Sequence, residues 1–278
     1  MKNILWVMLP LSAALALLSG RHTGTACADC SPLIQMPDLT ALWTGSAKMK
    51  LPYPAPPPPD EWRTLKPDER LAHVKDRVQA PLAALLEKQG LRLGAPAFIR
   101  IFKETRELEL WMQAGGKWQL FRTYPIAAMS GTLGPKLQEG DGQAPEGFYS
   151  VTPASLNPGS TFHLSFNIGY PNAYDQHHGR TGTFIMVHGN EVSIGCFAMT
   201  DPLIEEIYLI VDAALKKGQP EVPVHTFPFP LTDQRLAEFA EHPHAPFWRE
   251  LQPGYTAFET QNAPPQVTLR DGRYRIRE

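Results

Sequence analysis

A histidine and a cysteine stand eight positions apart in this chain, at His188 and Cys196, and small residues flank both. A thiol is a good nucleophile at neutral pH only as its thiolate, and a neighbouring imidazole is the commonest means of forming one. Gly195 directly precedes the cysteine, so the backbone can turn sharply and leave the Gly195 N–H free to bind an oxyanion. We therefore predict a cysteine-nucleophile enzyme that acts on an acyl group, with Cys196, His188 and Gly195 as its catalytic residues.

Less specific interpretations of these residues stay open. A lone cysteine is usually a buried small hydrophobe, and a histidine at the end of an apolar run can be a structural residue. Asp201 and Pro202 predict the N-cap and first residue of a helix shortly after Cys196. Because a helix N-terminus lowers the pKa of a thiol, this position favours the nucleophile over the buried hydrophobe.

Composition and motif content argue against several classes of function. The 278 residues are 43% hydrophobic and 19% charged, as in globular domains, and a net charge of −2 without a basic run argues against nucleic-acid binding. The sequence has no P-loop or dinucleotide-binding loop. A zinc site needs three or four ligands at a recognisable spacing, which the other candidate histidines do not provide: His163, His177, His178 and His225. We expect no metal, no other cofactor and no nucleic-acid partner.

Residues 1–28 have the features of an export signal. Lys2 supplies a positive charge, residues 4–20 form an almost unbroken apolar run, and residues 26–28 fit a small-x-small cleavage site. An uncleaved membrane anchor is the alternative, although this apolar run is short for a membrane span. Export implies an oxidising compartment, in which we still expect Cys196 to be a free thiol.

The segment after the signal is predicted to change from a tether to a helix. Residues 29–65 include six prolines in the eight positions 52–59, which favours an extended, semi-rigid spacer. Residues 66–95 carry apolar side chains at helical spacing. Because proline removes a helix hydrogen bond, Pro81 is expected to kink this helix or split it in two.

Residues 96–230 are the predicted catalytic domain, and short strands dominate it. The β-type runs are 97–102, 107–111, 118–122, 148–151, 162–166 and 183–187, with 222–225 as a last candidate. Gly115-Gly116 fits a hairpin turn, and a helix is expected from Asp201 to about Gly218. The prediction is a mainly β fold with flanking helices (α+β), whose largely antiparallel sheet forms a sandwich or barrel-like core.

The C-terminal residues 231–278 are predicted to form a small appendage. A helix is expected over about 232–241, and four aromatic residues are candidate anchors: Phe247, Trp248, Tyr255 and Phe258. Nothing in this segment suggests what it does.

Two long Gly/Pro-rich stretches, 130–149 and 168–182, interrupt the strands. Long loops on a β scaffold often bind substrate, and Arg180 in the second stretch could bind a carboxylate. A plain connection is an equally good interpretation of their composition.

At these residues the chain resembles the YkuD-type L,D-transpeptidase catalytic domain, most closely its YafK branch of Gram-negative cell envelopes. The likeness spans about 97–230 and weakens through the tail to Tyr255. It rests on ordered blocks: Phe102-Lys103-Glu104, 108–111, Ser130-Gly131, 133–136, Gly140-Asp141, 145–149, Asn157-Pro158, 169–172, 179–182, His188-Gly189 and 193–196. Several ordered blocks are far more specific than one His/Cys pair.

The resemblance implies a periplasmic enzyme of peptidoglycan. Cys196 would attack the meso-diaminopimelate carbonyl of a stem peptide, His188 would be the general base and acid, and the N–H groups of Gly195 and Cys196 would form the oxyanion hole. The matched blocks also supply the candidate substrate-binding residues Lys136, Tyr170, Asn172, Arg180, Gly189 and Ser193.

The resemblance leaves the acceptor open. With water as acceptor the enzyme is an amidase, and the YafK branch suggests release of a peptidoglycan-linked outer-membrane lipoprotein at its linking lysine. With an amine as acceptor it is a transpeptidase that forms cross-links or attaches the lipoprotein. Many YkuD enzymes have Ser-His-Gly-Cys where this chain has Ser193-Ile194-Gly195-Cys196, which puts ordinary cross-linking in doubt. A non-catalytic envelope-binding module and a metal-dependent peptidase are the alternatives from other classes.

Overall fold

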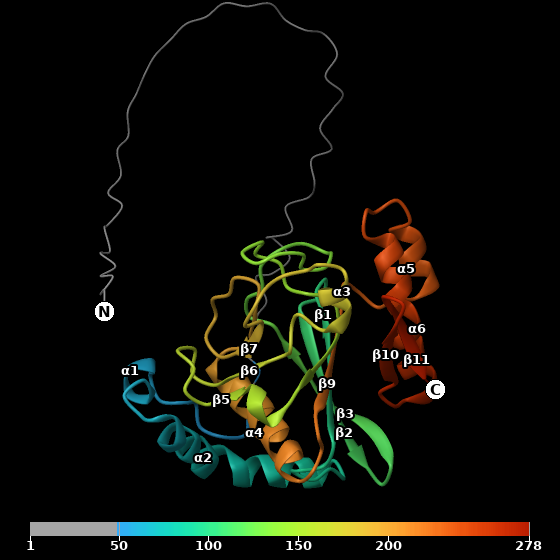
Figure 1. Cartoon of the computed structure of the whole chain (residues 1–278). Coiled ribbons are helices and arrows are strands. Elements are labelled where there is room, and N and C mark those ends of the chain that lie inside the picture. Colours follow the sequence, from blue (N-terminus) through green and yellow to red (C-terminus); the bar gives the residue numbers. More distant parts are fainter. Residues whose placement is uncertain (1–48, 50, 278) are drawn as a thin grey trace, which may run out of the picture. The chain divides into compact units, whose positions relative to one another are not determined.

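The computed structural model describes residue 49 and residues 51–277 of the chain (Figure 1). The predicted export signal, 1–28, and the first part of the predicted tether lie outside the described residues. In the described part, no helix combines the length and apolar character needed to cross a membrane.

A five-stranded sheet forms the larger layer, in the order β3-β2-β1-β9-β4. Its strands are β1 (Ala97–Phe102), β2 (Glu107–Ala114), β3 (Lys117–Pro125), β4 (Gly147–Val151) and β9 (Val222–Phe227). All neighbours are antiparallel except β1 and β9. Gly115 and Gly116 both have positive φ and connect β2 to β3, as a two-residue hairpin turn requires. The strands predicted in these positions are confirmed.

A second, four-stranded sheet carries the sequence motif of interest, in the order β5-β6-β7-β8. Its strands are short: β5 (Leu156–Asn157), β6 (Ser165–Asn167), β7 (Met186–His188) and β8 (Phe197–Ala198). The predicted strands 162–166 and 183–187 were too long, because His163 and Phe184 adopt positive φ and interrupt the extended backbone. Within the described residues both of these sheets are open and form no closed barrel, and the predicted α+β fold is confirmed.

Helix α4 (Asp201–Lys216) lies between the two sheets and contacts β1 and β9 of one and β6 and β7 of the other. Pro202 occupies its first turn, as predicted, but the N-cap residue is Thr200 rather than Asp201. The Asp201 carboxylate instead accepts a hydrogen bond from the Asn190 N–H at 2.7 Å. Nearly every side chain of α4 is buried, including three carboxylates: Glu205, Glu206 and Asp212. The helix is therefore the centre of the domain rather than a flank.

Helix α2 (Pro67–Lys88) packs on α4 through Val74, Val78, Leu82 and Leu86. Pro67 opens it, and the Glu69 carboxylate accepts the Lys66 N–H at 2.9 Å. Pro81 lies inside this one helix, so the predicted split into two helices is wrong. The buried apolar stripe continues through Pro81 and outweighs the single lost hydrogen bond.

The described end of the predicted tether, residues 51–65, packs on the domain instead of acting as a spacer. Tyr53 is buried and its hydroxyl donates to the Glu206 carboxylate, while Arg77 donates to the Pro54 carbonyl at 2.7 Å. The short helix α1 (Pro59–Trp62) places the Trp62 ring in a fully buried position. Aromatic residues between the prolines therefore anchor this part of the segment.

The C-terminal residues form more structure than the sequence predicted. The expected helix 232–241 is present as the shorter α5 (Asp233–Glu238), and the aromatic anchors lie on a second helix, α6 (Ala245–Gln261). A hairpin of β10 (Gln266–Arg270) and β11 (Arg273–Arg277) follows. The appendage shares one apolar cluster with the large sheet, which includes Phe102, Phe227, Phe247, Trp248 and Tyr255.

We expect Trp62→Ala to lower the free energy of unfolding by about 3–5 kcal/mol, because it leaves a large cavity under α1. Urea unfolding followed by circular dichroism measures the change. Trp118→Ala, at a half-buried tryptophan of β3, is the matched control and should cost less. A loss below about 1 kcal/mol would show that residues 51–65 are not anchored as described.

Candidate active site

The structure brings His188 and Cys196 together through two neighbouring parallel strands. His188 is the last residue of β7, and Cys196 immediately precedes β8. Val187 pairs with Phe197 and His188 with Ala198, so Cys196 lies beside the segment that ends in His188. The sequence prediction that these two residues share one site is consistent with this register.

The environment of His188 fixes its charge and its tautomer. Its Nδ1 lies 2.6 Å from the Gly189 carbonyl oxygen, which can only accept, so Nδ1 carries the proton and Nε2 is the free acceptor. Burial lowers the pKa of His188, and the Gly189 carbonyl and the Asp201 carboxylate offset this only in part. The imidazole is thus neutral at pH 7, the form that a general base needs.

Gly189 positions this histidine through its backbone. Its N–H donates to the carbonyls of Phe162 and Leu164, at 3.0 and 3.1 Å. A Cβ atom at this position would lie 2.5 Å from an Asp201 carboxylate oxygen and 2.8 Å from the Phe162 carbonyl. Only glycine fits, so Gly189 acts here through His188; its predicted contact with substrate stays a prediction.

The Cys196 thiol is free and hydrogen bonds with backbone groups. Its Sγ donates to the Phe184 carbonyl at 3.5 Å and accepts the Met186 N–H at 3.4 Å. Burial raises the pKa of Cys196, although the Met186 N–H and the Lys136 charge act in the opposite direction. Because burial raises its pKa above the ordinary thiol value, Cys196 is a thiol at neutral pH, and among the described residues no hydrogen bond joins it to His188.

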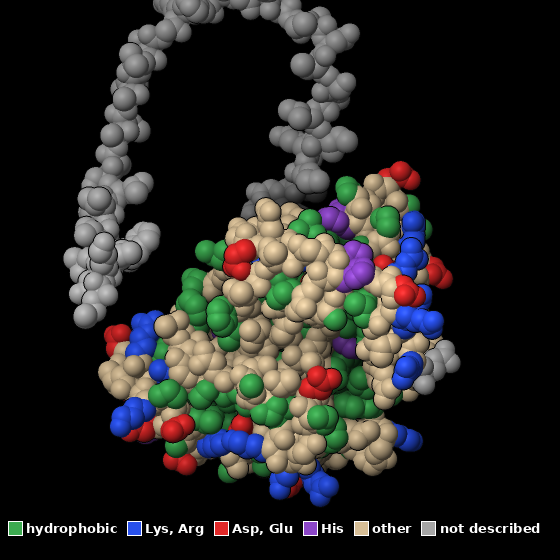
Figure 2. All heavy atoms as spheres, in the orientation of Figure 1, with side chains coloured by type: hydrophobic (Ala, Val, Ile, Leu, Met, Phe, Trp, Pro, Cys, Tyr) green, Lys and Arg blue, Asp and Glu red, His purple; other side chains and the backbone are tan. Residues whose placement is uncertain are grey.

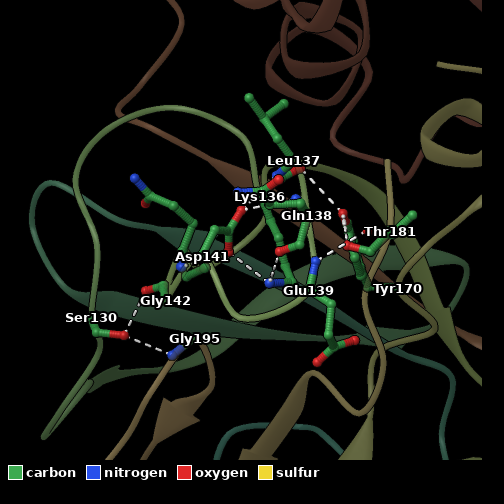
Figure 3. Close-up of polar contacts among 12 residues, drawn as sticks. Ser130, Lys136, Leu137, Gln138, Glu139, Asp141, Gly142, Tyr170, Thr181 and Gly195 are labelled. Atoms are coloured by element: carbon green, nitrogen blue, oxygen red, sulfur yellow. Dashed lines mark hydrogen bonds and ion pairs between the residues drawn. The ribbon is translucent and has the colours of Figure 1, made fainter. Parts of the chain in front are cut away.

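The Gly195 N–H is not free, contrary to the sequence prediction. Gly195 has φ +83°, which presents its N–H to the Ser130 hydroxyl at 2.7 Å, and Ser130 donates in turn to the Gly142 carbonyl at 2.7 Å (Figure 3). The Ser130 hydroxyl oxygen therefore lies as close to the Gly195 N–H as a bound oxyanion would. Ser193 closes the same turn by donating to the Cys196 carbonyl at 2.6 Å. Ser130 must therefore move before Gly195 can donate to substrate.

The first Gly/Pro-rich stretch is an ordered loop around one carboxylate. Asp141 accepts from Lys136 Nζ at 2.6 Å and from the N–H groups of Leu137, Gln138 and Gln143 at 2.8 to 3.0 Å (Figure 3). The Tyr170 hydroxyl lies 3.2 Å from the carbonyl oxygens of both Lys136 and Thr181 and shares its one proton between them. Lys136 and Tyr170 are buried and hold the loop; their contact with substrate stays a prediction.

Asn172 and Arg180 join the second stretch to the C-terminal appendage. Asn172 caps the short helix α3 (Ala173–His177) and donates to the Tyr274 hydroxyl of β11 at 2.9 Å. Arg180 donates to the Asp175 carboxylate at 2.8 Å, and its guanidinium lies 4.5 Å from the centre of the Phe247 ring. Both side chains have internal partners, and substrate contact stays a prediction for them as well.

Three residues near the site were not predicted as functional: Ser130, Asp141 and Asp201. Asp141 stands between two glycines, a pattern typical of a loop organised by its own carboxylate. Ser130 and Asp201 act on atoms more than ten positions away, and no local spacing indicates such contacts. Across the described residues no group of three or more His, Cys, Asp or Glu could hold a metal ion.

Asp141→Asn tests the loop through its pH dependence. Burial opposes ionisation of Asp141, but the hydrogen bonds from Lys136 and three N–H groups outweigh it and lower the pKa to about 2. A lowered pKa stabilises the folded state above the unfolded value of about 3.9, and this contribution disappears as the pH falls toward 2. We expect the variant to lose about 2 kcal/mol at pH 7, and the difference from wild type to shrink below pH 5, as measured by urea unfolding. Asp271→Asn, on the exposed hairpin turn, should change stability by less than about 0.5 kcal/mol at either pH.

The raised pKa of Cys196 predicts slow alkylation of the resting enzyme. With iodoacetamide, the rate at Cys196 should keep rising with pH beyond the ordinary thiol value of about 8.5, because the thiolate fraction is small at pH 7. Peptide mass spectrometry of the labelled protein measures this, with Cys196→Ala as the control for Cys27 and Cys30. A fast rate that is already constant at pH 6 would instead indicate a resting thiolate–imidazolium pair.

Comparison with known proteins identifies the family of this chain. The model of the YkuD family, the L,D-transpeptidase catalytic domain, matches residues 96–225. YafK of Escherichia coli strain K12, named "Putative L,D-transpeptidase YafK", is 46% identical over 187 residues, which cover 67% of this chain and 76% of YafK. The protein of the same name from strain O157:H7 matches to the same extent.

Solved structures with a similar arrangement include two proteins of other bacteria. Pgp2 of Campylobacter jejuni, a helical cell shape determining protein, matches in its K307A form with a TM-score of 0.40 and 20% identity, over 72% of this chain and 66% of Pgp2. Bd1075 of Bdellovibrio bacteriovorus matches with a TM-score of 0.34 and 18% identity, over 64% of this chain and 78% of Bd1075. From the family match and the identity to YafK, the chain belongs to the YkuD family of L,D-transpeptidase catalytic domains, which are enzymes of peptidoglycan.

Proposed function

We propose that this enzyme hydrolyses the amide between meso-diaminopimelate of a peptidoglycan stem peptide and the linking lysine of an outer-membrane lipoprotein. The observation that carries the proposal is the neutral His188, whose Nε2 is free to accept a proton. Its strand, β7, pairs with β8, the strand that begins directly after Cys196. Residues 1–28, with the features of an export signal, support a periplasmic location.

The first half of the reaction forms a thioester. His188 Nε2 takes the proton of Cys196 as Sγ attacks the diaminopimelate carbonyl carbon. The carbonyl oxygen, now an oxyanion, displaces the Ser130 hydroxyl from the Gly195 N–H, and the Cys196 N–H is the second donor that the family resemblance implies. When the tetrahedral intermediate collapses, the C–N bond breaks and the imidazolium returns its proton to the leaving lysine amine.

Water completes the second half. It attacks the thioester carbonyl while His188 Nε2 takes its proton, the C–S bond breaks, and the proton passes to Sγ. The products are a free diaminopimelate carboxyl and the regenerated thiol. The Nδ1–H bond to the Gly189 carbonyl holds the ring in one tautomer through both halves, so a single nitrogen transfers every proton.

The ion pairs of Lys136 and Arg180 support water rather than a second stem peptide as acceptor. An amine acceptor from peptidoglycan would have to be held beside the thioester through its carboxylates. Lys136 and Arg180, the two cations with predicted substrate contacts, are instead engaged by Asp141 and Asp175. Water needs no such binding site.

The direct test uses muropeptides whose tripeptide ends in diaminopimelate joined to a lysyl-arginine remnant. The wild type should release the remnant and leave the free tripeptide, as measured by intact mass. Cys196→Ala should lose at least about 1,000-fold of this activity and His188→Gln at least about 100-fold.

Other products would decide for the alternatives. Dimeric or amine-exchanged muropeptides would make the enzyme a transpeptidase. Loss of activity in a chelator would indicate a metal-dependent peptidase. If the wild type and both variants all left the substrate unchanged, the non-catalytic envelope-binding module would be the remaining interpretation.

A further inference from the structure

Exposed apolar side chains gather around the catalytic pair. Within the described residues six large hydrophobic side chains are exposed, and four of them lie on the segments that form the site. We name these four the apolar rim: Phe162 (37% exposed), Phe184 (73%), Val192 (57%) and Ile194 (85%). On the face drawn in Figure 2, apolar side chains lie to the left of and below the region that Figure 1 labels β7, and most Lys and Arg side chains lie toward the edges.

Each segment of the rim touches a catalytic group. The Phe162 ring lies 4.8 Å from the His188 ring, centre to centre. The Phe184 carbonyl accepts the hydrogen bond of the Cys196 thiol. Ile194 and Val192 belong to the loop that precedes Gly195. A Cβ atom at Gly195 would lie 3.8 Å from the Ile185 side chain, so this loop lies against the segment that contains Phe184. The rim segments therefore adjoin both His188 and Cys196.

The exposure of the rim is imposed by the backbone. Phe184 has φ +52°, a conformation that bulky side chains rarely adopt. Ile194 is flanked by Ser193 and Gly195, whose hydrogen bonds to the Cys196 carbonyl and to Ser130 fix the turn. Clustered apolar surface on a monomer marks a binding site, because water solvates it poorly.

The chemistry of the rim does not match a stem peptide. Diaminopimelate carries amine and carboxylate groups, which need polar or charged partners. Two polar side chains of the rim segments have partners within the chain, Ser193 with the Cys196 carbonyl and Thr183 with Glu139 at 3.2 Å, while the exposed Glu191 beside Val192 is the one carboxylate on the loop that precedes Gly195. Apolar side chains of a polypeptide are the groups that such a surface can bury.

We propose that the apolar rim binds the polypeptide on the leaving-group side of the scissile amide, through apolar side chains near its linking lysine. This inference rests on the proposed hydrolysis and names the surface that recognises the protein part of its substrate. The stem peptide then only has to reach Cys196, and the linked protein supplies the binding energy that orients its amide.

The test compares two substrates that differ only in the size of the leaving group. One is insoluble peptidoglycan that carries the linked protein, and the other is the muropeptide with the lysyl-arginine remnant. For the double variant Val192→Ser/Ile194→Ser, we expect kcat/KM to fall at least tenfold on the protein-linked substrate and less than threefold on the remnant. Phe184→Ser, on the opposite segment, should show the same selectivity, so the result does not depend on one loop.

Leu120→Ser is the matched control, since Leu120 is an exposed apolar residue (37%) of β3 outside the rim, and both activities should be unchanged. Thermal unfolding shows that each variant is folded.

An equal fall of kcat/KM on both substrates in the rim variants, or no fall, overturns the proposal while the proposed hydrolysis stands. A wild type that cleaves neither substrate removes the hydrolysis and the proposal together. If residues 1–48 or a second copy covered the rim, the double variant would raise both activities or change the sedimentation of the enzyme, and either result also overturns it.

Discussion

The active site depends on the parallel pairing of β7 with β8. Parallel neighbours are normally joined by a crossover of a dozen or more residues, but here only residues 189–196 connect the two strands. So short a connection must bend sharply, and it does so with Asn190 and Gly195 at positive φ. Gly189 at its start and Ser193 near its end are hydrogen bonded to the neighbouring backbone, so His188 and Cys196 are held at fixed positions.

Buried carboxylates connect parts of the domain that lie far apart in the sequence. Glu206 on α4 binds Tyr53 and Tyr124, and Glu146 binds Lys103, the Gly134 N–H and the Trp248 indole. Each carboxylate thus joins segments far apart in the sequence, from residues 51–65 to the C-terminal appendage. Because removal of one partner leaves a buried charge without compensation, loss of any single partner is expected to destabilise the domain strongly.

The sequence reveals what depends on local pattern and misses what depends on distant contacts. Strands β1 to β4, the start of α2 and the hairpin at Gly115-Gly116 follow from periodicity and turn chemistry. The His188 and Cys196 pair was recognisable because both lie in one short motif. The Ser130 hydroxyl on Gly195 could not be predicted, because it joins positions 65 residues apart. Residues 51–65 illustrate the same limit, since prolines predict an extended chain but Tyr53 and Trp62 decide that it packs.

In the proposed mechanism the resting site combines a protonated thiol with an oxyanion donor that is already occupied, and the two features have one physical consequence. Burial keeps Cys196 from ionising, and the Ser130 hydroxyl holds the Gly195 N–H. Thiolates oxidise far more readily than thiols, so a protonated Cys196 resists oxidation better than a permanent thiolate. Reactivity then requires a carbonyl that competes with Ser130 and a proton transfer to the neutral His188. A substrate that brings its own binding energy, from surfaces beyond the carbonyl itself, is best able to drive both changes at once.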